Sequence, residues 1–182
     1  MTVRTPLAAA SLAFAMLATP AAAQEVFAGV YDHGVDTPFT LKTGEGGADI
    51  AAGYRFAPVE ALGAIGKPEP YLVASVNTTG DTSFAAVGLS WTIGKGPVYL
   101  RPGIGLAIHD GPSRRFNPVT GRETDLGSRV LFEPEIGLGY RINERLSAEA
   151  HWMHVSHAQL LNSGQNPGLD MIGLRLNYRL GR

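Results

Sequence analysis

Apolar and polar residues alternate one by one through several short segments of this chain. Over residues 98–109, even positions hold Val98, Leu100 and Ile104, whereas Arg101 is at an odd one. Successive residues of a β-strand point to opposite faces, so this period predicts strands with one apolar and one polar face. Beyond the N-terminal region, no stretch approaches the eighteen consecutive apolar residues of a membrane-spanning helix. Any membrane-spanning form must therefore be a closed barrel, because only helices and closed barrels satisfy every backbone group in hydrocarbon.

Eight alternating segments, separated by Gly, Pro, Asn and Asp, are the predicted strands. They are Val26–Tyr31, Gly47–Phe56, Tyr71–Asn77, Ser83–Ile93, Val98–His109, Ser128–Ile142, Arg145–Ser156 and Leu169–Leu180. An even number of strands returns the chain to the side on which it began. The expected fold is all-β, an eight-stranded antiparallel up-and-down transmembrane β-barrel.

The N-terminus has the features of a secretory signal peptide. Arg4 supplies positive charge, an apolar run follows over residues 6–17, and Ala21-Ala22-Ala23 fits an A-x-A cleavage site. We expect residues 1–23 to be removed and residues 24–182 to form a single barrel domain in a Gram-negative outer membrane. The absence of Cys is compatible with the cell envelope.

Charge and motif content exclude several classes of function. The formal net charge is −1, which gives no electrostatic basis for nucleic-acid binding. No Gly-rich phosphate loop lies between a strand and a helix, and the His and carboxylate residues lack the spacing of metal ligands. We therefore expect no cofactor, no metal and no nucleic-acid partner.

The polar face of the later segments carries both signs of charge. A narrow eight-stranded barrel is filled by its own side chains. We therefore expect an interior ion-pair network that joins Arg101, Arg175 and Arg179 with Glu133, Glu135 and Glu149. Glycines on the same face leave room for these long side chains. A soluble antiparallel sheet with one face in water would show the same period and is the alternative.

Three polar residues of the last two segments are at even-numbered positions, as are the apolar residues of these segments. His154, Ser156 and Asp170 are even-numbered, like Trp152 and Leu174, and are therefore expected on the lipid-facing side. If both termini lie in the periplasm, Ser156 ends the seventh strand and Asp170 begins the eighth at the outer rim. All three would then lie at one height, near the outer leaflet.

These residue types are the ones that acyl transfer to serine requires. The reaction needs a hydroxyl nucleophile, a base and a third group that holds the base in the correct tautomer. His154 and Ser156 are two residues apart on one face, and Asp170 is expected to be a direct or diagonal neighbour across the strands. The alternative is that a His and a Ser occupy the wet edge of the membrane interface without any chemistry.

The segment His154-Val155-Ser156-His157-Ala158, followed by Asn166-Pro167-Gly168-Leu169-Asp170, resembles the lipid A 3-O-deacylase family (PagL). The resemblance implies an eight-stranded outer-membrane barrel that cuts the ester-linked acyl chain at the 3-position of lipid A. It also implies that His154 is the base, Ser156 the nucleophile and Asp170 the orienting acid, with lipid A or lipopolysaccharide as the partner.

The chain departs from the family pattern at two places. The family commonly uses Glu as the acid, and its S-N-A-G motif supplies an Asn and a Gly associated with the oxyanion hole. This chain has His157 and Gln159 there, so the candidates for oxyanion binding or support are His157, Gln159 and Asn166.

Two other functions fit the same pattern. One is a non-enzymatic structural or adhesive barrel, and the other is a periplasmic lipid carrier whose apolar face would point inward. A homodimer is compatible with the predicted fold.

Overall fold

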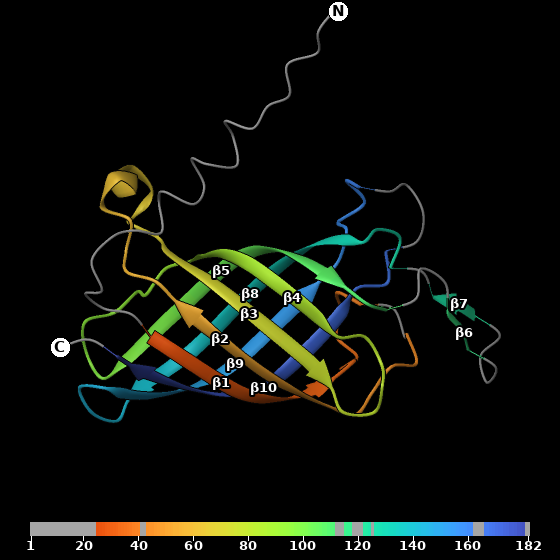
Figure 1. The fold of residues 1–182 in the computed structure, drawn as a ribbon, viewed down its shortest axis with the longest axis horizontal. Coiled ribbons are helices and arrows are strands. Elements are labelled where there is room, and N and C mark those ends of the chain that lie inside the picture. The colour runs from red at the N-terminus through yellow and green to blue at the C-terminus, as the bar shows by residue number, and fades with distance from the viewer. Residues whose placement is uncertain are drawn as a thin grey trace, which may run out of the picture.

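The computed structural model describes residues 25–40, 43–111, 115–117, 122–124, 126–161 and 166–180. Eight strands close into one barrel (Figure 1). They are β1 (Glu25–His33), β2 (Ala48–Arg55), β3 (Glu69–Asn77), β4 (Phe84–Ser90), β5 (Val98–His109), β8 (Val130–Arg141), β9 (Leu146–Val155) and β10 (Leu169–Arg179). The predicted signal peptide lies outside the described residues.

Each barrel strand pairs antiparallel with its neighbours along the chain, in the order β1-β10-β9-β8-β5-β4-β3-β2. The register that closes the barrel runs from Glu25 opposite Arg179 to His33 opposite Met171. Every barrel strand is therefore hydrogen-bonded to a neighbour along both of its edges, and no edge of the sheet remains open. The predicted eight-stranded up-and-down barrel is confirmed.

Strand boundaries differ from the sequence prediction mainly at β3 and β4. The third strand begins at Glu69, and the fourth ends at Ser90, after which Ile93 makes only an isolated bridge with Leu100. Three short elements were not predicted. A 3-10 helix, η1 (Glu60–Ile65), lies between β2 and β3, and the strands β6 (Arg115–Asn117) and β7 (Arg122–Thr124) pair with each other between β5 and β8. No helix among the described residues is long and apolar enough to cross a membrane.

The two faces of the barrel have opposite chemistry. On β10, Leu174 is 71% exposed on the outside, whereas the next residue, Arg175, is 1% exposed in the lumen. The same contrast holds around the barrel, with Val30 and Ile108 outside and charged residues inside. This arrangement is that of a barrel with an apolar outer wall. It contradicts the lipid-carrier alternative, in which the apolar face would line the interior.

An ion-pair network fills the lumen, as predicted. Arg101 Nη1 lies 2.6 Å from Glu149 Oε1, and Arg175 Nη2 lies 3.0 Å from Glu135 Oε2. Glycines make room for these side chains. A Cβ at Gly103 would lie 2.7 Å from Glu135 Cγ.

Two residues of the predicted ion-pair network, Arg179 and Glu133, have other surroundings than the prediction gave them. Arg179, at the end of β10, is exposed, because the strand has there passed the packed part of the lumen. Glu133 accepts a hydrogen bond from the Tyr71 hydroxyl instead of pairing with an arginine. Arg55 and Glu25, from the first two strands, form a further pair that was not predicted.

Candidate active site

Polar side chains converge at the rim farthest from the chain termini, where β9 ends and β10 begins. Asp170 stands directly opposite His154 in the register of these strands. His154 Nδ1 lies 2.8 Å from Asp170 Oδ1, and the two side chains are 11% and 0% exposed. The structure therefore brings the predicted base and acid together, on the strand face that also carries Ile172 and Leu174.

The Asp170 contact determines which nitrogen of His154 can act as a base. An ionised carboxylate only accepts hydrogen bonds, so Nδ1 of the imidazole is the nitrogen that carries the proton. Nε2 then keeps its lone pair, which a base needs to accept a proton from a hydroxyl. The local geometry thus provides the tautomer that the proposed chemistry needs.

Ser156 directly follows β9 and continues its ladder. It exchanges two backbone hydrogen bonds with Phe132, at 2.7 and 3.0 Å, so its side chain keeps the parity of His154. The Ser156 side chain is buried and, among the described residues, forms no hydrogen bond with His154.

Asp170 has two further donors that the sequence analysis did not include. Trp152 donates its indole Nε1–H to Asp170 Oδ1 at 2.8 Å, and its ring stacks on the His154 imidazole with centroids 5.9 Å apart. The Thr37 hydroxyl donates to Asp170 Oδ2. The parity of Trp152, two residues before His154, indicated its position. Thr37 lies in a loop 133 residues away, and no sequence signal links it to Asp170.

The loop between β1 and β2 explains why the rim residues are buried although they project from the outer wall. Val35 donates its backbone N–H to the Asp170 carbonyl at 3.0 Å. Phe39 is exposed, and its ring lies 6.2 Å from the Trp152 ring, centroid to centroid. This loop therefore covers the strand face around Asp170, whereas Ile172, two residues further along β10, is exposed.

The three candidates for oxyanion binding or support lie in and beside the turn after Ser156. His157 is fully buried, its backbone N–H donates to Asn166 Oδ1 at 3.1 Å, and its Nδ1 accepts the Gln159 backbone N–H. Gln159 is exposed. It and Ala158 both have positive φ, and Leu160 N–H closes the turn onto the His157 carbonyl. His157 and Asn166 therefore hold the shape of this turn.

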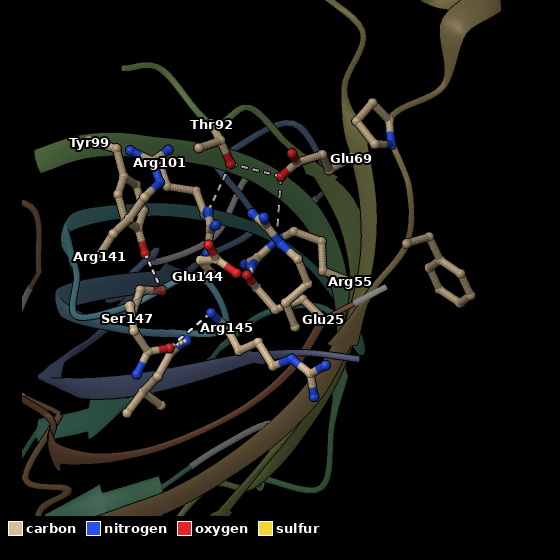
Figure 2. A pocket seen from close by; sticks show the side chains of 15 residues that line it. Glu25, Arg55, Glu69, Thr92, Tyr99, Arg101, Arg141, Glu144, Arg145 and Ser147 are labelled. Atoms are coloured by element: carbon tan, nitrogen blue, oxygen red, sulfur yellow. Dashed lines mark hydrogen bonds and ion pairs between the residues drawn. The ribbon is translucent and has the colours of Figure 1, made fainter. Parts of the chain in front are cut away.

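A cavity at the opposite end of the barrel belongs to the lumen. Its volume is about 830 Å³, and its lining includes Glu25, Arg55, Tyr99 and Arg101 (Figure 2). Its charged groups are largely engaged with one another, as in the contact between Arg101 Nη1 and Glu25 Oε1 at 3.0 Å. Among the described residues, no group of three or more His, Asp or Glu could hold a metal ion.

A closed barrel with an apolar outer wall, a charged lumen and a polar cluster at one rim defines a β-barrel protein of the outer membrane. The sequence matches the family described as lipid A 3-O-deacylase (PagL) over residues 52–179. The chain belongs to this family. Among the curated proteins, none matches the chain in sequence.

Solved structures with the same barrel support the fold. The crystal structure of the outer membrane enzyme PagL matches with 17% identity and a TM-score of 0.59, covering 85% of this chain and 98% of that one. The N-terminal β-barrel domain of Pseudomonas aeruginosa OprF matches with 12% identity and a TM-score of 0.54, covering 86% and 97%. Neisserial surface protein A (NspA) matches with 10% identity and a TM-score of 0.51, covering 86% and 97%.

Proposed function

We propose that this chain is a lipid A 3-O-deacylase that hydrolyses the ester-linked acyl chain at the 3-position of lipid A by a Ser-His-Asp mechanism. The observation that carries the proposal is the hydrogen bond of 2.8 Å between His154 Nδ1 and Asp170 Oδ1 on the outer face of the rim. The family match supports the substrate class, and the cluster supplies groups suited to ester hydrolysis.

In the first half of the reaction, His154 Nε2 takes the proton of Ser156 as its Oγ attacks the ester carbonyl carbon. Asp170 stabilises the imidazolium that forms. The carbon–oxygen bond to the sugar then breaks, and the imidazolium returns its proton to the departing sugar oxygen. The acyl chain remains on Ser156 as an ester.

In the second half, water attacks the acyl-enzyme while His154 accepts a proton from it. Collapse of this intermediate releases the fatty acid and returns the proton to Ser156. We assign His157 and Asn166 to the support of the turn that positions Ser156, because their contacts fix that turn. The side-chain amide of Gln159 is the candidate donor to the oxyanion from this turn, because the backbone N–H groups of Gln159 and Leu160 already donate to His157.

The position of the site suits a substrate that stays in the bilayer. Ile172 and Leu174 extend from Asp170 along the exposed outer wall of β10. We place the termini in the periplasm and this rim at the outer leaflet, so the acyl chain can lie in hydrocarbon while its ester meets Ser156. Assembly into a homodimer stays a prediction.

The test is release of 3-hydroxy fatty acid from purified lipopolysaccharide, measured by mass spectrometry of lipid A and of the free acid. Ser156→Ala is expected to form a folded barrel and to abolish the release. Ser83→Ala, which removes a hydroxyl from another part of the same rim, is the matched control and should retain it. Release by Ser156→Ala would show that another residue is the nucleophile.

The rival is a barrel with a structural or adhesive role, which remains an alternative because a shared fold does not imply a shared function. It predicts no release by the wild type, no labelling of Ser156 by a serine-reactive phosphonate, and tolerance of changes at His154 and Asp170.

A further inference from the structure

The two oxygens of the Asp170 carboxylate are held from different sides. Oδ1 accepts from His154 Nδ1 and from Trp152 Nε1, both at 2.8 Å. Oδ2 accepts from the Thr37 hydroxyl, which comes from the loop between β1 and β2. Asp170 is 0% exposed, and no Lys or Arg among the described residues lies within ion-pair distance of it. Neutral donors therefore replace water around this carboxylate.

The Thr37 hydroxyl has a single proton, and its surroundings direct that proton to Asp170. Thr37 Oγ1 accepts the backbone N–H of Phe39 at 3.1 Å, so one of its lone pairs is already occupied. The backbone N–H of Thr37 donates to Thr40 Oγ1 at 3.3 Å. This local turn orients the hydroxyl and leaves Asp170 Oδ2 as the acceptor of its proton.

The loop that carries Thr37 is anchored to the barrel on both sides of the wall. Outside, the Val35 N–H bonds to the Asp170 carbonyl at 3.0 Å. On the lumen side, Glu45 of the same loop lies 2.9 Å from His33 Nε2, and His33 Nδ1 lies 2.9 Å from Asp49. The described parts of this loop, before and after residues 41–42, are thus both bonded to the barrel.

We propose that Thr37 is a positioning residue that fixes the rotation of the Asp170 carboxylate so that Oδ1 faces His154. This inference rests on the proposed function and adds to it a residue from the opposite end of the sequence. A carboxylate held at one oxygen can turn about its Cβ–Cγ bond, whereas one held at both oxygens cannot. Because Asp has a shorter side chain than Glu, its reach to His154 leaves little tolerance for such a rotation.

The kinetic test compares Thr37→Val, which keeps the shape but removes the hydroxyl, with Thr37→Ser, which restores it. Loss of a hydrogen bond to a charged group predicts a fall in kcat of about 10- to 100-fold for Thr37→Val, with KM little changed. Thr37→Ser should recover most of the rate. Thr78→Val removes another rim hydroxyl, which donates to the Ala48 carbonyl, and should leave the rate unchanged.

A second measurement does not depend on activity. In protein labelled with ¹⁵N-histidine, NMR should show a hydrogen-bonded Nδ1–H of His154 in the wild type and in Thr37→Ser. This signal should be shifted or lost in Thr37→Val. Folding of each variant is checked by its gel mobility with and without heating, and Thr37→Ala replaces Thr37→Val if the latter does not fold.

The outcomes separate the two proposals. If the wild type releases no fatty acid, or Ser156→Ala releases as much, the proposed function fails, and the NMR signal alone decides the role of Thr37. An unchanged signal in Thr37→Val overturns the positioning role whatever the activity. A kcat of Thr37→Val within twofold of the wild type, in an active enzyme, also overturns it.

Discussion

The lumen and the outer rim of this barrel both bury carboxylates, but they neutralise them in different ways. In the lumen, Glu135 and Glu149 lie beside arginines, with Arg175 Nη2 3.0 Å from Glu135 and Arg101 Nη1 2.6 Å from Glu149. At the rim, Asp170 is equally buried but accepts its hydrogen bonds from His154, Trp152 and Thr37.

This difference separates a structural role from a chemical one. An arginine stays protonated at any physiological pH, so the lumen pairs have the same charge at all times. Among the described residues, no permanently charged cation lies beside the rim carboxylate, which can therefore stabilise a positive charge that appears on His154 only when a proton arrives. The same comparison leads us to expect loss of activity from changes at the rim and loss of stability from changes in the lumen.

Asp170→Asn is the change with the largest expected effect. It keeps the size of the side chain but removes the charge that, in the proposed mechanism, stabilises a protonated His154 and sets its tautomer. We expect deacylation to fall by about 10⁴-fold, by analogy with the same change in serine protease triads, with little change in barrel stability. Asp32→Asn, at an exposed position on β1, is the control for initial rates of fatty-acid release. Equal rates for both variants would contradict a role for Asp170.

Arg175→Met tests the lumen. It leaves Glu135 buried without its closest arginine, which costs about 3–5 kcal/mol of unfolding free energy. The urea midpoint of the barrel in micelles should fall accordingly, while the folded fraction keeps its activity. Adding Glu135→Leu should restore much of the stability, because the pair is then replaced by apolar packing. A double variant less stable than Arg175→Met would contradict this account.

Gly168→Ala tests the space beside the imidazole. Gly168 has a φ of +62°, and a Cβ there would lie 2.6 Å from His154 Cε1. His154 would have to move by about 1 Å to relieve this contact, and a misplacement of about that size costs about 10²-fold in rate. Gly80→Ala has the same backbone strain, with a φ of +86°, but its Cβ would contact nothing within 4 Å. If both variants lose the same activity, backbone strain and not contact with His154 is the cause.

Arg179→Gln should have the smallest effect. Arg179 was expected in the lumen network from its parity, but its side chain is exposed. We expect no measurable change in the urea midpoint or in the rate of fatty-acid release. A midpoint as low as that of Arg175→Met would place Arg179 in the network after all.

Parity along the strands was enough to predict the barrel and the shared face of the rim residues. A period of two is a property of each strand alone, so the opposite faces of Leu174 and Arg175 could be assigned without knowledge of the partners. The rim positions of the two strands predicted Asp170 as a direct or diagonal neighbour of His154, and the register makes it the direct one. These predictions needed only local pattern and the direction of each strand.

Contacts that involve residues outside the alternating strands could not be predicted from parity. Thr37 reaches Asp170 from a loop, where no periodicity applies, and nothing in the sequence indicates that this loop folds over the outer wall. Parity also says nothing about where the packed lumen ends, which is why Arg179, although it lines the cavity at the end of the barrel, is exposed and not packed into the network. Glu133 likewise has the predicted face but a tyrosine partner, because partner choice depends on positions across several strands.

The filled lumen has a consequence for the cell that carries this protein. At mid-height, Glu133, Glu149 and Arg175 are at most 1% exposed, so the described side chains fill the bore there. Many copies can therefore sit in the bilayer without making it leaky. In the proposed reaction, substrate and product would then exchange sideways through the lipid, and the rate of lateral diffusion would set an upper limit on turnover.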